Sequence, residues 1–130
     1  MKKIVFYILI LSLSLWARPQ WIDSYEEAQE RAFKDKKLIM LMLSRENCQA
    51  CWYMEHIVFV NKKVKALIED NFVPVYLDIN SDFIPDGFSY IGTPTFYFTD
   101  AKGKKVSERL DGGANAKDFT QKLTEVLSTN

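Results

Sequence analysis

The sequence predicts an α/β domain in which a central mixed β-sheet is flanked by helices on both faces. Two observations in the first half predict it: apolar strand-like segments at 38–43 and 72–79 each follow a segment with helical spacing. A third is a hairpin signal around 100–103, followed by an amphipathic helix. The chain has 130 residues, of which 48 % are hydrophobic, so one packed domain is feasible.

A capping box opens the first predicted helix. Ser24 supplies the capping hydroxyl, and Glu27 supplies a carboxylate three residues later. The apolar residues that follow at helical spacing are Tyr25, Ala28, Ala32 and Phe33. We therefore expect a helix over 24–36. Segment 38–43 is apolar without polar alternation, which predicts a strand buried on both faces.

The middle of the chain predicts two helices and a second strand. After a polar loop, a helix is expected to begin at or just before Cys48 and to run to about residue 58. Asn61 is suited to cap a third helix. Segment 72–79 is rich in β-branched and aromatic residues, and Pro74 near its start is tolerated there. The first two strands are then parallel and joined by a right-handed crossover.

The last third predicts a hairpin and a covering helix. Residues 95–99 and 105–110 are expected to form its two strands around a turn that contains Gly103. Gly112 and Gly113 then break the chain. A helix over 116–127 is expected to turn these residues inward: Phe119, Leu123, Val126 and Leu127.

Residues 1–17 predict a secretory signal peptide. A basic start is followed by an apolar run of about 13 residues, short of the ~20 that span a bilayer as a helix. Ala17 is a small residue suited to cleavage. We expect a domain over 18–130 in the periplasm or an equivalent exported space. The alternative is an uncleaved N-terminal anchor.

Charge and cysteine content exclude several classes. The 17 basic and 17 acidic side chains balance, so there is no basic excess of the kind that binds nucleic acid. Two cysteines cannot build a disulfide-rich scaffold, so the core must hold the fold. We expect a monomer without a nucleic-acid partner.

The two cysteines form a Cys-x-x-Cys motif between a predicted strand and helix. Cys48 falls at the helix N-terminus, where unpaired N–H groups and the helix dipole favour a thiolate, the form that attacks disulfides. Cys51 lies one turn further on the same helix face. We therefore expect Cys48 to be the nucleophile and Cys51 to be the thiol that resolves the mixed disulfide.

Other readings of the cysteine pair give different functions. A structural disulfide would make the protein a non-catalytic binding module, and a thiolate metal carrier is a third possibility. Zinc requires four ligands and His56 is the only histidine, while covalent haem requires histidine where Trp52 stands. We expect no metal and no cofactor. His56 is expected at the surface or half-buried, without a role as a catalytic base.

The segment from Gly92 to Phe96 is the second informative motif. A proline at the entrance of a strand often marks only a bend. The sharper interpretation is a cis peptide between Thr93 and Pro94, which would turn the Thr93 backbone toward the thiols. Its N–H and C=O would then pair with an extended substrate segment, so Thr93 and Pro94 are candidate substrate-binding residues.

On these motifs the sequence resembles the thioredoxin-like superfamily over residues 23–127. It is most similar to small bacterial periplasmic thioredoxin-related proteins and to the C-terminal thioredoxin domain of membrane thiol:disulfide interchange proteins. In the latter a glutamate follows the second cysteine by four residues, as Glu55 does here. The resemblance implies a thioredoxin fold and a protein disulfide oxidoreductase, with Cys48, Cys51 and cis-Pro94 as its functional core.

Departures from the thioredoxin pattern affect the chemistry. Asn47 replaces the usual tryptophan, and Met42 replaces a buried aspartate thought to accept a proton from the resolving thiol. Glu55 is the candidate proton relay, although it also fits a solvated helix carboxylate. Glu46 could lower Cys48 reactivity by repulsion.

The expected partners are proteins with cysteine thiols or disulfides. We favour reduction of these partners over their oxidation. A reductase in an exported space needs a membrane thiol–disulfide electron donor, and an oxidase needs an acceptor. Five aromatic residues are candidates for a rim around the thiols, although we expect most of them in the core: Trp52, Tyr53, Phe83, Phe88 and Tyr90.

Overall fold

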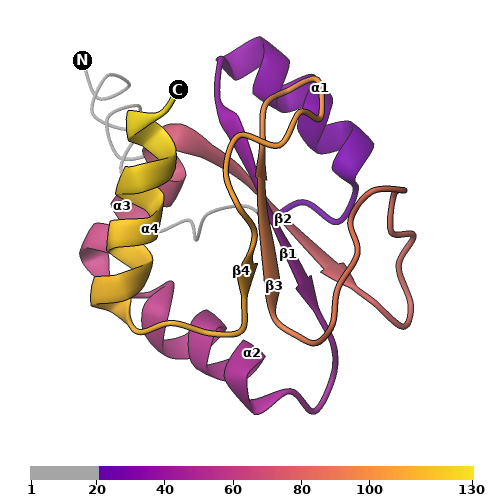
Figure 1. The fold of residues 1–130 in the computed structure, drawn as a ribbon, viewed down its shortest axis with the longest axis vertical. Coiled ribbons are helices and arrows are strands. Elements are labelled where there is room, and N and C mark those ends of the chain that lie inside the picture. Colours follow the sequence, from indigo (N-terminus) through magenta and orange to yellow (C-terminus); the bar gives the residue numbers. More distant parts are fainter. Residues whose placement is uncertain (1–20) are drawn as a thin grey trace, which may run out of the picture.

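A four-stranded mixed sheet with strand order β2-β1-β3-β4 lies at the centre of the computed structural model, which describes residues 21–130 (Figure 1). The strands are β1 (Leu38–Ser44), β2 (Phe72–Asp78), β3 (Thr95–Thr99) and β4 (Leu110–Asp111). Strands β1 and β2 are parallel, whereas β3 is antiparallel to both β1 and β4. The predicted signal peptide at 1–17 lies outside the described residues.

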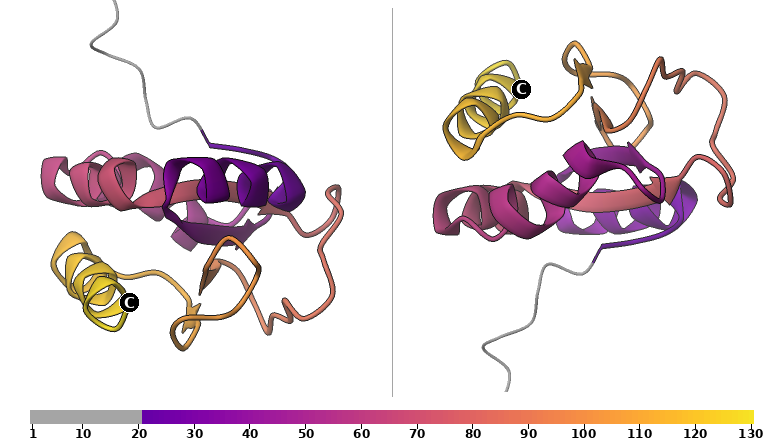
Figure 2. Two further views of the ribbon diagram at one scale, coloured as in Figure 1. Left: turned by 90° about the horizontal axis from the view of Figure 1, so that it is seen from above. Right: turned by 90° about the horizontal axis from the view of Figure 1, so that it is seen from below.

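Helices cover both faces of this sheet, which confirms the predicted thioredoxin fold. The helical elements are α1 (Tyr25–Asp35), α2 (Gln49–Tyr53), the π-helix η1 (Met54–Val58), α3 (Lys62–Asn71) and α4 (Ala116–Ser128). Helix α1 packs on one face, and η1, α3 and α4 pack on the other. The turned views in Figure 2 show α1 and α4 on opposite sides of the strands. No helix within residues 21–130 is long and apolar enough to cross a membrane.

Strand β1 supplies the middle of both core layers. Ile39, Leu41 and Leu43 join the core under α1. Met40 and Met42 face the opposite way, into the core under η1, α3 and α4. All five side chains are fully buried, so the prediction of a strand buried on both faces is confirmed.

The predicted helix starts are also confirmed. Ser24 Oγ accepts a hydrogen bond from the Glu27 N–H, and Asn61 Oδ1 accepts from the N–H groups of Lys63 and Val64. Pro74 lies in the edge strand β2. The outer edge of this strand is bridged by Ile22, whose N–H donates to the Pro74 carbonyl oxygen at 3.0 Å.

Three details differ from the predictions. The helix expected from Cys48 to residue 58 is an α-helix only to Tyr53 and a π-helix beyond it. Phe33, expected on the buried face of α1, is 75 % exposed. The other three predicted residues, Tyr25, Ala28 and Ala32, are buried and form the inner face of α1.

The predicted hairpin strand over 105–110 is the third correction. Lys105 makes a single bridge to Thr99, and regular pairing resumes only in β4. Apart from Val106 the segment between them is polar, and its side chains bond to loop residues as well as to the sheet. Lys105 Nζ donates to the Gly87 carbonyl, for example, and Arg109 binds Asp111 and Ser89. The Val106 N–H still donates to the Phe98 carbonyl oxygen of β3 at 2.9 Å, but without alternating apolar residues the regular pairing does not continue from there to β4.

Candidate active site

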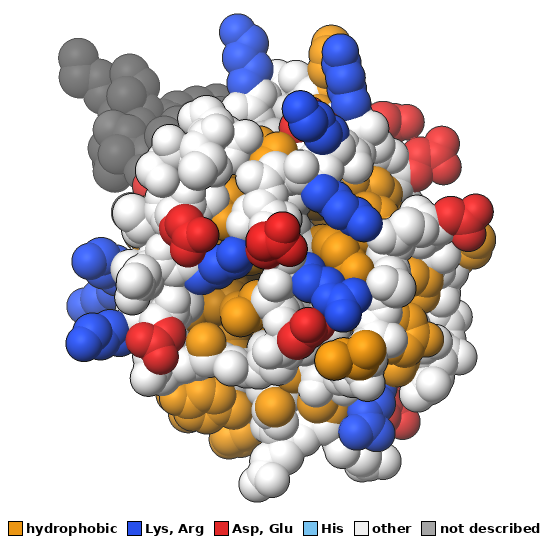
Figure 3. Space-filling model, viewed as in Figure 1, with side chains coloured by type: hydrophobic (Ala, Val, Ile, Leu, Met, Phe, Trp, Pro, Cys, Tyr) orange, Lys and Arg blue, Asp and Glu red, His pale blue; other side chains and the backbone are white. Residues whose placement is uncertain are grey.

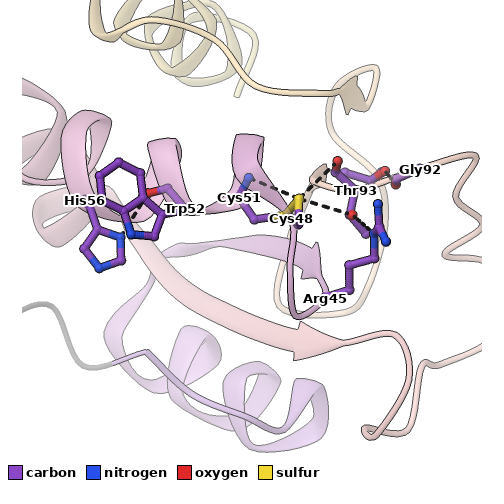
Figure 4. The surroundings of a disulfide bond; sticks show 8 residues. Arg45, Cys48, Cys51, Trp52, His56, Gly92 and Thr93 are labelled. Carbon is purple, nitrogen blue, oxygen red and sulfur yellow. Dashed lines mark hydrogen bonds between the residues drawn. A yellow bond between two sulfur atoms is a disulfide. The ribbon is translucent and has the colours of Figure 1, made fainter.

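The two cysteines lie at the point where β1 passes through a short loop into α2 (Figure 4). They form a disulfide whose Cα atoms are 5.2 Å apart. Asn47 precedes them with a φ of 56°, a left-handed conformation that asparagine tolerates better than tryptophan. Cys48 is the N-cap of α2 and is 8 % exposed, while Cys51 is 2 % exposed. Cys48 is therefore the outer of the two sulfurs.

Two hydrogen-bond donors point at the Cys48 sulfur. The Cys51 backbone N–H lies 3.2 Å from Cys48 Sγ, and the Thr93 hydroxyl oxygen lies 3.4 Å from it. The Thr93 carbonyl oxygen is also 3.5 Å away, a contact in which the disulfide sulfur has no hydrogen to donate. A sulfur anion at this position would accept both hydrogen bonds, and hydrogen bonds to a charged group favour its ionised form.

Thr93 reaches the sulfur from the loop that leads into β3. The Thr93–Pro94 peptide is cis, as expected. Pro94 is buried, and its carbonyl oxygen accepts a hydrogen bond from the Gly112 N–H at 2.8 Å. Thr95 Oγ1 donates to the Gly92 carbonyl at the same distance. These bonds fix the loop on both sides of Thr93, so its backbone and hydroxyl are held beside the disulfide.

A cation also belongs to this arrangement. Arg45 lies in the loop after β1, is exposed, and donates from Nε to Thr93 Oγ1 at 2.9 Å (Figure 4). From the sequence, this loop was predicted only to be polar and Thr93 to act through its backbone, so neither Arg45 nor the Thr93 hydroxyl was expected at the site. A basic residue three positions before Cys48 was the available signal, but the contact spans 48 residues.

Glu55 lies in η1, one turn after Cys51, and is half-buried. Burial raises the pKa of its carboxyl, and neighbouring His56 offsets part of this rise. Met42, where the resemblance implies an aspartate in related proteins, is fully buried in the same core as Cys51. Ser44 Oγ is also buried and has no hydrogen-bond partner within residues 21–130.

His56 is on the surface, as expected. Its ring stacks on Trp52 with centroids 4.7 Å apart and an interplanar angle of 13°. Nδ1 lies 3.0 Å from the Trp52 carbonyl oxygen, which can only accept, so this nitrogen donates. The imidazole is thereby directed along the helix rather than toward the sulfurs (Figure 4).

The expectation that most of the five candidate rim residues are in the core is wrong. Phe88 alone among them is buried, against Tyr25 and Tyr97. The exposed fractions of the others are 55 % for Trp52, 36 % for Tyr53, 83 % for Phe83 and 41 % for Tyr90. Trp52 follows Cys51 in the sequence, but its exposed ring stacks on His56, away from the sulfurs (Figure 4).

The face of the molecule seen in Figure 3 carries charges of both signs. On the face shown in Figure 3, acidic and basic side chains alternate, and hydrophobic ones emerge toward the end where α2 lies in Figure 1. Surface hollows of about 730 and 880 Å³ lie elsewhere, beside α1 and between α3 and α4. Within the described residues, no group of three or more acidic, histidine or cysteine side chains is placed to hold a metal.

Comparisons with known proteins find relatives of this chain by sequence and by fold. A family model described as a thioredoxin-like domain matches residues 25–127. The thiol:disulfide interchange protein DsbD of Ralstonia nicotianae is 28 % identical over 120 residues, which is 88 % of this chain. The chain spans about a fifth (20 %) of that relative's length.

Solved structures give the same result for the fold. A thioredoxin from Thermus thermophilus matches with a TM-score of 0.71 and 27 % identity, over 85 % of this chain and 88 % of that one. A DsbH oxidoreductase matches at 0.69 and 23 % identity, over 88 % of each chain. The oxidised C-terminal domain of Neisseria meningitidis DsbD matches at 0.65 and 18 % identity, over 82 % of this chain and 98 % of that domain.

Proposed function

Because the chain belongs to the thioredoxin-like family, we propose that it is a thiol–disulfide oxidoreductase that exchanges electrons with cysteine pairs of other proteins through Cys48 and Cys51. The observation that carries this proposal is the bonded pair of sulfurs at the start of α2, with two donors directed at the outer sulfur. The donors stabilise Cys48 as a thiolate, which is the attacking species in disulfide exchange.

In the reducing direction, the reaction has two balanced steps. The Cys48 thiolate attacks a partner disulfide, forms a mixed disulfide and releases one partner sulfur as a thiolate. Cys51 loses its proton and attacks Cys48 Sγ, which re-forms the Cys48–Cys51 disulfide and releases the second partner sulfur. Two electrons pass from the dithiol to the partner, which takes up two protons. The structure corresponds to the oxidised end of this cycle.

Glu55 is the proposed acceptor of the Cys51 proton. Its carboxyl lies one helical turn beyond Cys51, and its raised pKa brings it closer to that of a thiol than an ordinary glutamate. The apolar side chain of Met42 offers no alternative acceptor at the buried position beneath the cysteines.

Thr93 and Pro94 are the proposed partner-binding residues. The Thr93 carbonyl oxygen lies 3.5 Å from Cys48 Sγ, so a chain bound along this backbone would bring its own cysteine next to the nucleophile. Main-chain hydrogen bonds of this kind recognise an extended segment largely independently of its sequence.

We further propose that the protein works in the periplasm and reduces its partners. The predicted signal peptide at 1–17 supports export, and the similarity to an interchange protein supports a role in a chain of disulfide exchanges. After each turnover the Cys48–Cys51 disulfide of a reductase must be reduced again. In an oxidising compartment a membrane thiol–disulfide donor is the expected electron source.

Catalytic disulfide reduction tests this function directly. The protein, supplied with dithiothreitol, is expected to accelerate insulin reduction, and Cys48→Ser and Cys51→Ser should each abolish the acceleration. A wild-type rate equal to that of dithiothreitol alone would identify the pair as a static disulfide. The reduction potential of the couple then gives the direction: a value near that of thioredoxin, roughly −270 mV, supports a reductase, and one near −120 mV supports an oxidase.

A further inference from the structure

We propose that Arg45 is a positioning residue that orients the Thr93 hydroxyl toward Cys48 Sγ, so that the two side chains together stabilise the Cys48 thiolate. The inference rests on the proposed function, because it concerns the reactivity of the same sulfur. Three atoms carry it: Arg45 Nε lies 2.9 Å from Thr93 Oγ1, which lies 3.4 Å from Cys48 Sγ.

The direction of these hydrogen bonds follows from the chemistry of the groups. A guanidinium N–H only donates, so Thr93 Oγ1 must accept from Arg45. The hydroxyl has a single hydrogen, which its rotation can aim at any acceptor in reach. Because Arg45 donates to the oxygen from one side, the hydroxyl hydrogen must point away from Arg45. Cys48 Sγ lies 3.4 Å from the oxygen and accepts it. Arg45 therefore selects the hydroxyl rotamer that donates to Cys48.

The same chain of bonds is stronger in the reduced protein. A sulfur anion in place of the disulfide makes the hydroxyl bond charge-assisted, and such bonds are about twice as strong as neutral ones. The positive charge of Arg45 draws electron density from the hydroxyl and so makes it a better donor. Thr93 thus complements the Cys51 N–H, which approaches the sulfur from the helix.

Arg45 is available for this role. Within residues 21–130, no carboxylate lies within ion-pair distance of its guanidinium. The side chain is exposed, so solvent screens its direct Coulomb attraction to the sulfur, and its effect must pass mainly through Thr93. The other charged or titratable side chains on the segments that adjoin Cys48 and Thr93 include Glu46, Tyr53, Glu55, His56 and Tyr90, together with Arg109 and Asp111, which bond to each other next to Gly112.

A double-mutant cycle on thiol reactivity tests the inference. All variants are made in a Cys51→Ala background, and the rate of Cys48 alkylation by iodoacetamide is measured against pH. Thr93→Val removes the hydroxyl at constant shape, and Arg45→Met removes the guanidinium. Each is expected to raise the pKa of Cys48 enough to lower the thiolate fraction about tenfold at a pH below the pKa. Arg45→Met should have no further effect once Thr93 is valine.

Three controls make the outcome unambiguous. Thr93→Ser retains the hydroxyl and should restore most of the reactivity. Arg45→Lys retains the charge without the planar fork and should restore only part of it. Arg31→Met removes the same charge from the exposed surface of α1, on the other face of the sheet, and should leave the pKa unchanged.

Two results would overturn the inference. The first is an Arg45→Met effect of equal size with threonine or valine at position 93, which would make Arg45 an independent surface charge. The second is an unchanged pKa in Thr93→Val. The proposed function fails separately, when Cys48 of the otherwise unaltered protein has a pKa at or above that of an ordinary thiol, about 8.5.

Discussion

The backbone N–H of Cys51 lies 3.2 Å from the sulfur of Cys48, so the resolving residue also helps to hold the nucleophile as an anion. This hydrogen bond does not depend on the side chain of residue 51. Replacement of Cys51 by alanine therefore removes the resolving sulfur and leaves the activating N–H in place.

The Cys51→Ala variant is expected to trap its partner. After incubation with a peptide that contains a disulfide, mass spectrometry should show a stable adduct on Cys48. Cys48→Ala, with Cys51 retained, should form at least tenfold less adduct, because Cys51 is 2 % exposed. Equal adduct yields from the two variants would show that Cys48 is not the preferred nucleophile.

Glu55→Gln should change how the stability of the oxidised protein depends on pH. Because burial raises the Glu55 pKa above its ordinary value of 4.5, the unfolded chain loses this proton at a lower pH than the folded protein does. The wild type therefore loses stability as pH rises from about 4.5 through the folded pKa, and glutamine lacks this loss.

Urea unfolding at pH 4 and pH 7 measures the effect. The free energy of unfolding of Glu55→Gln relative to the wild type should be higher at pH 7 than at pH 4. Glu30→Gln, which removes an exposed carboxylate from α1, serves as the matched control. A relative stability of Glu55→Gln that is the same at both pH values would contradict the buried setting of this carboxyl.

Phe119 is expected to anchor α4 to the sheet. It is fully buried, with its ring centroid 5.2 Å from that of Phe96 and 5.7 Å from that of Phe59. Phe119→Ala should lower the free energy of unfolding by roughly 3–5 kcal/mol, measured by urea denaturation. Phe33→Ala makes the same change at a side chain that is 75 % exposed and should cost less than about 0.5 kcal/mol. Similar losses would show that α4 is not held by this ring.

Arg109 is expected to tie the loop before Thr93 to the sheet. Its Nη1 donates to the Ser89 carbonyl at 3.1 Å and to the Tyr97 hydroxyl at 3.2 Å. In Arg109→Met, amide hydrogens of residues 86–92 should exchange faster, while those of β1 should be unaffected. Unchanged exchange in the loop would mean that its other contacts suffice, such as the bond from Lys105 to Gly87.

The sequence predicted the parts of the fold that depend on local patterns. The caps at Ser24 and Asn61 and the doubly buried strand β1 follow from residue type and spacing alone. The cis peptide before Pro94 followed from a motif. These features place the cysteines at a strand–helix junction, which is enough to predict the chemistry.

Features that depend on distant contacts were missed. The bonds from Arg45 to Thr93 and from Thr93 to Cys48 join segments 48 and 45 residues apart, and no local pattern indicates them. The interrupted hairpin after Lys105 has a similar cause, because side chains of that segment bond to loop residues such as Gly87. The exposure of Trp52 also depends on tertiary packing, since an aromatic ring on a helix fits core and surface equally well.

The pH dependence of Cys48 alkylation in the reduced, otherwise unaltered protein tests the central claim most directly. With peptide mass mapping to separate the two thiols, Cys48 should react as a thiolate with a pKa well below the ordinary value of about 8.5. A Cys48 pKa at or above that value would contradict the account, because the hydrogen bonds directed at this sulfur would then not stabilise its anion.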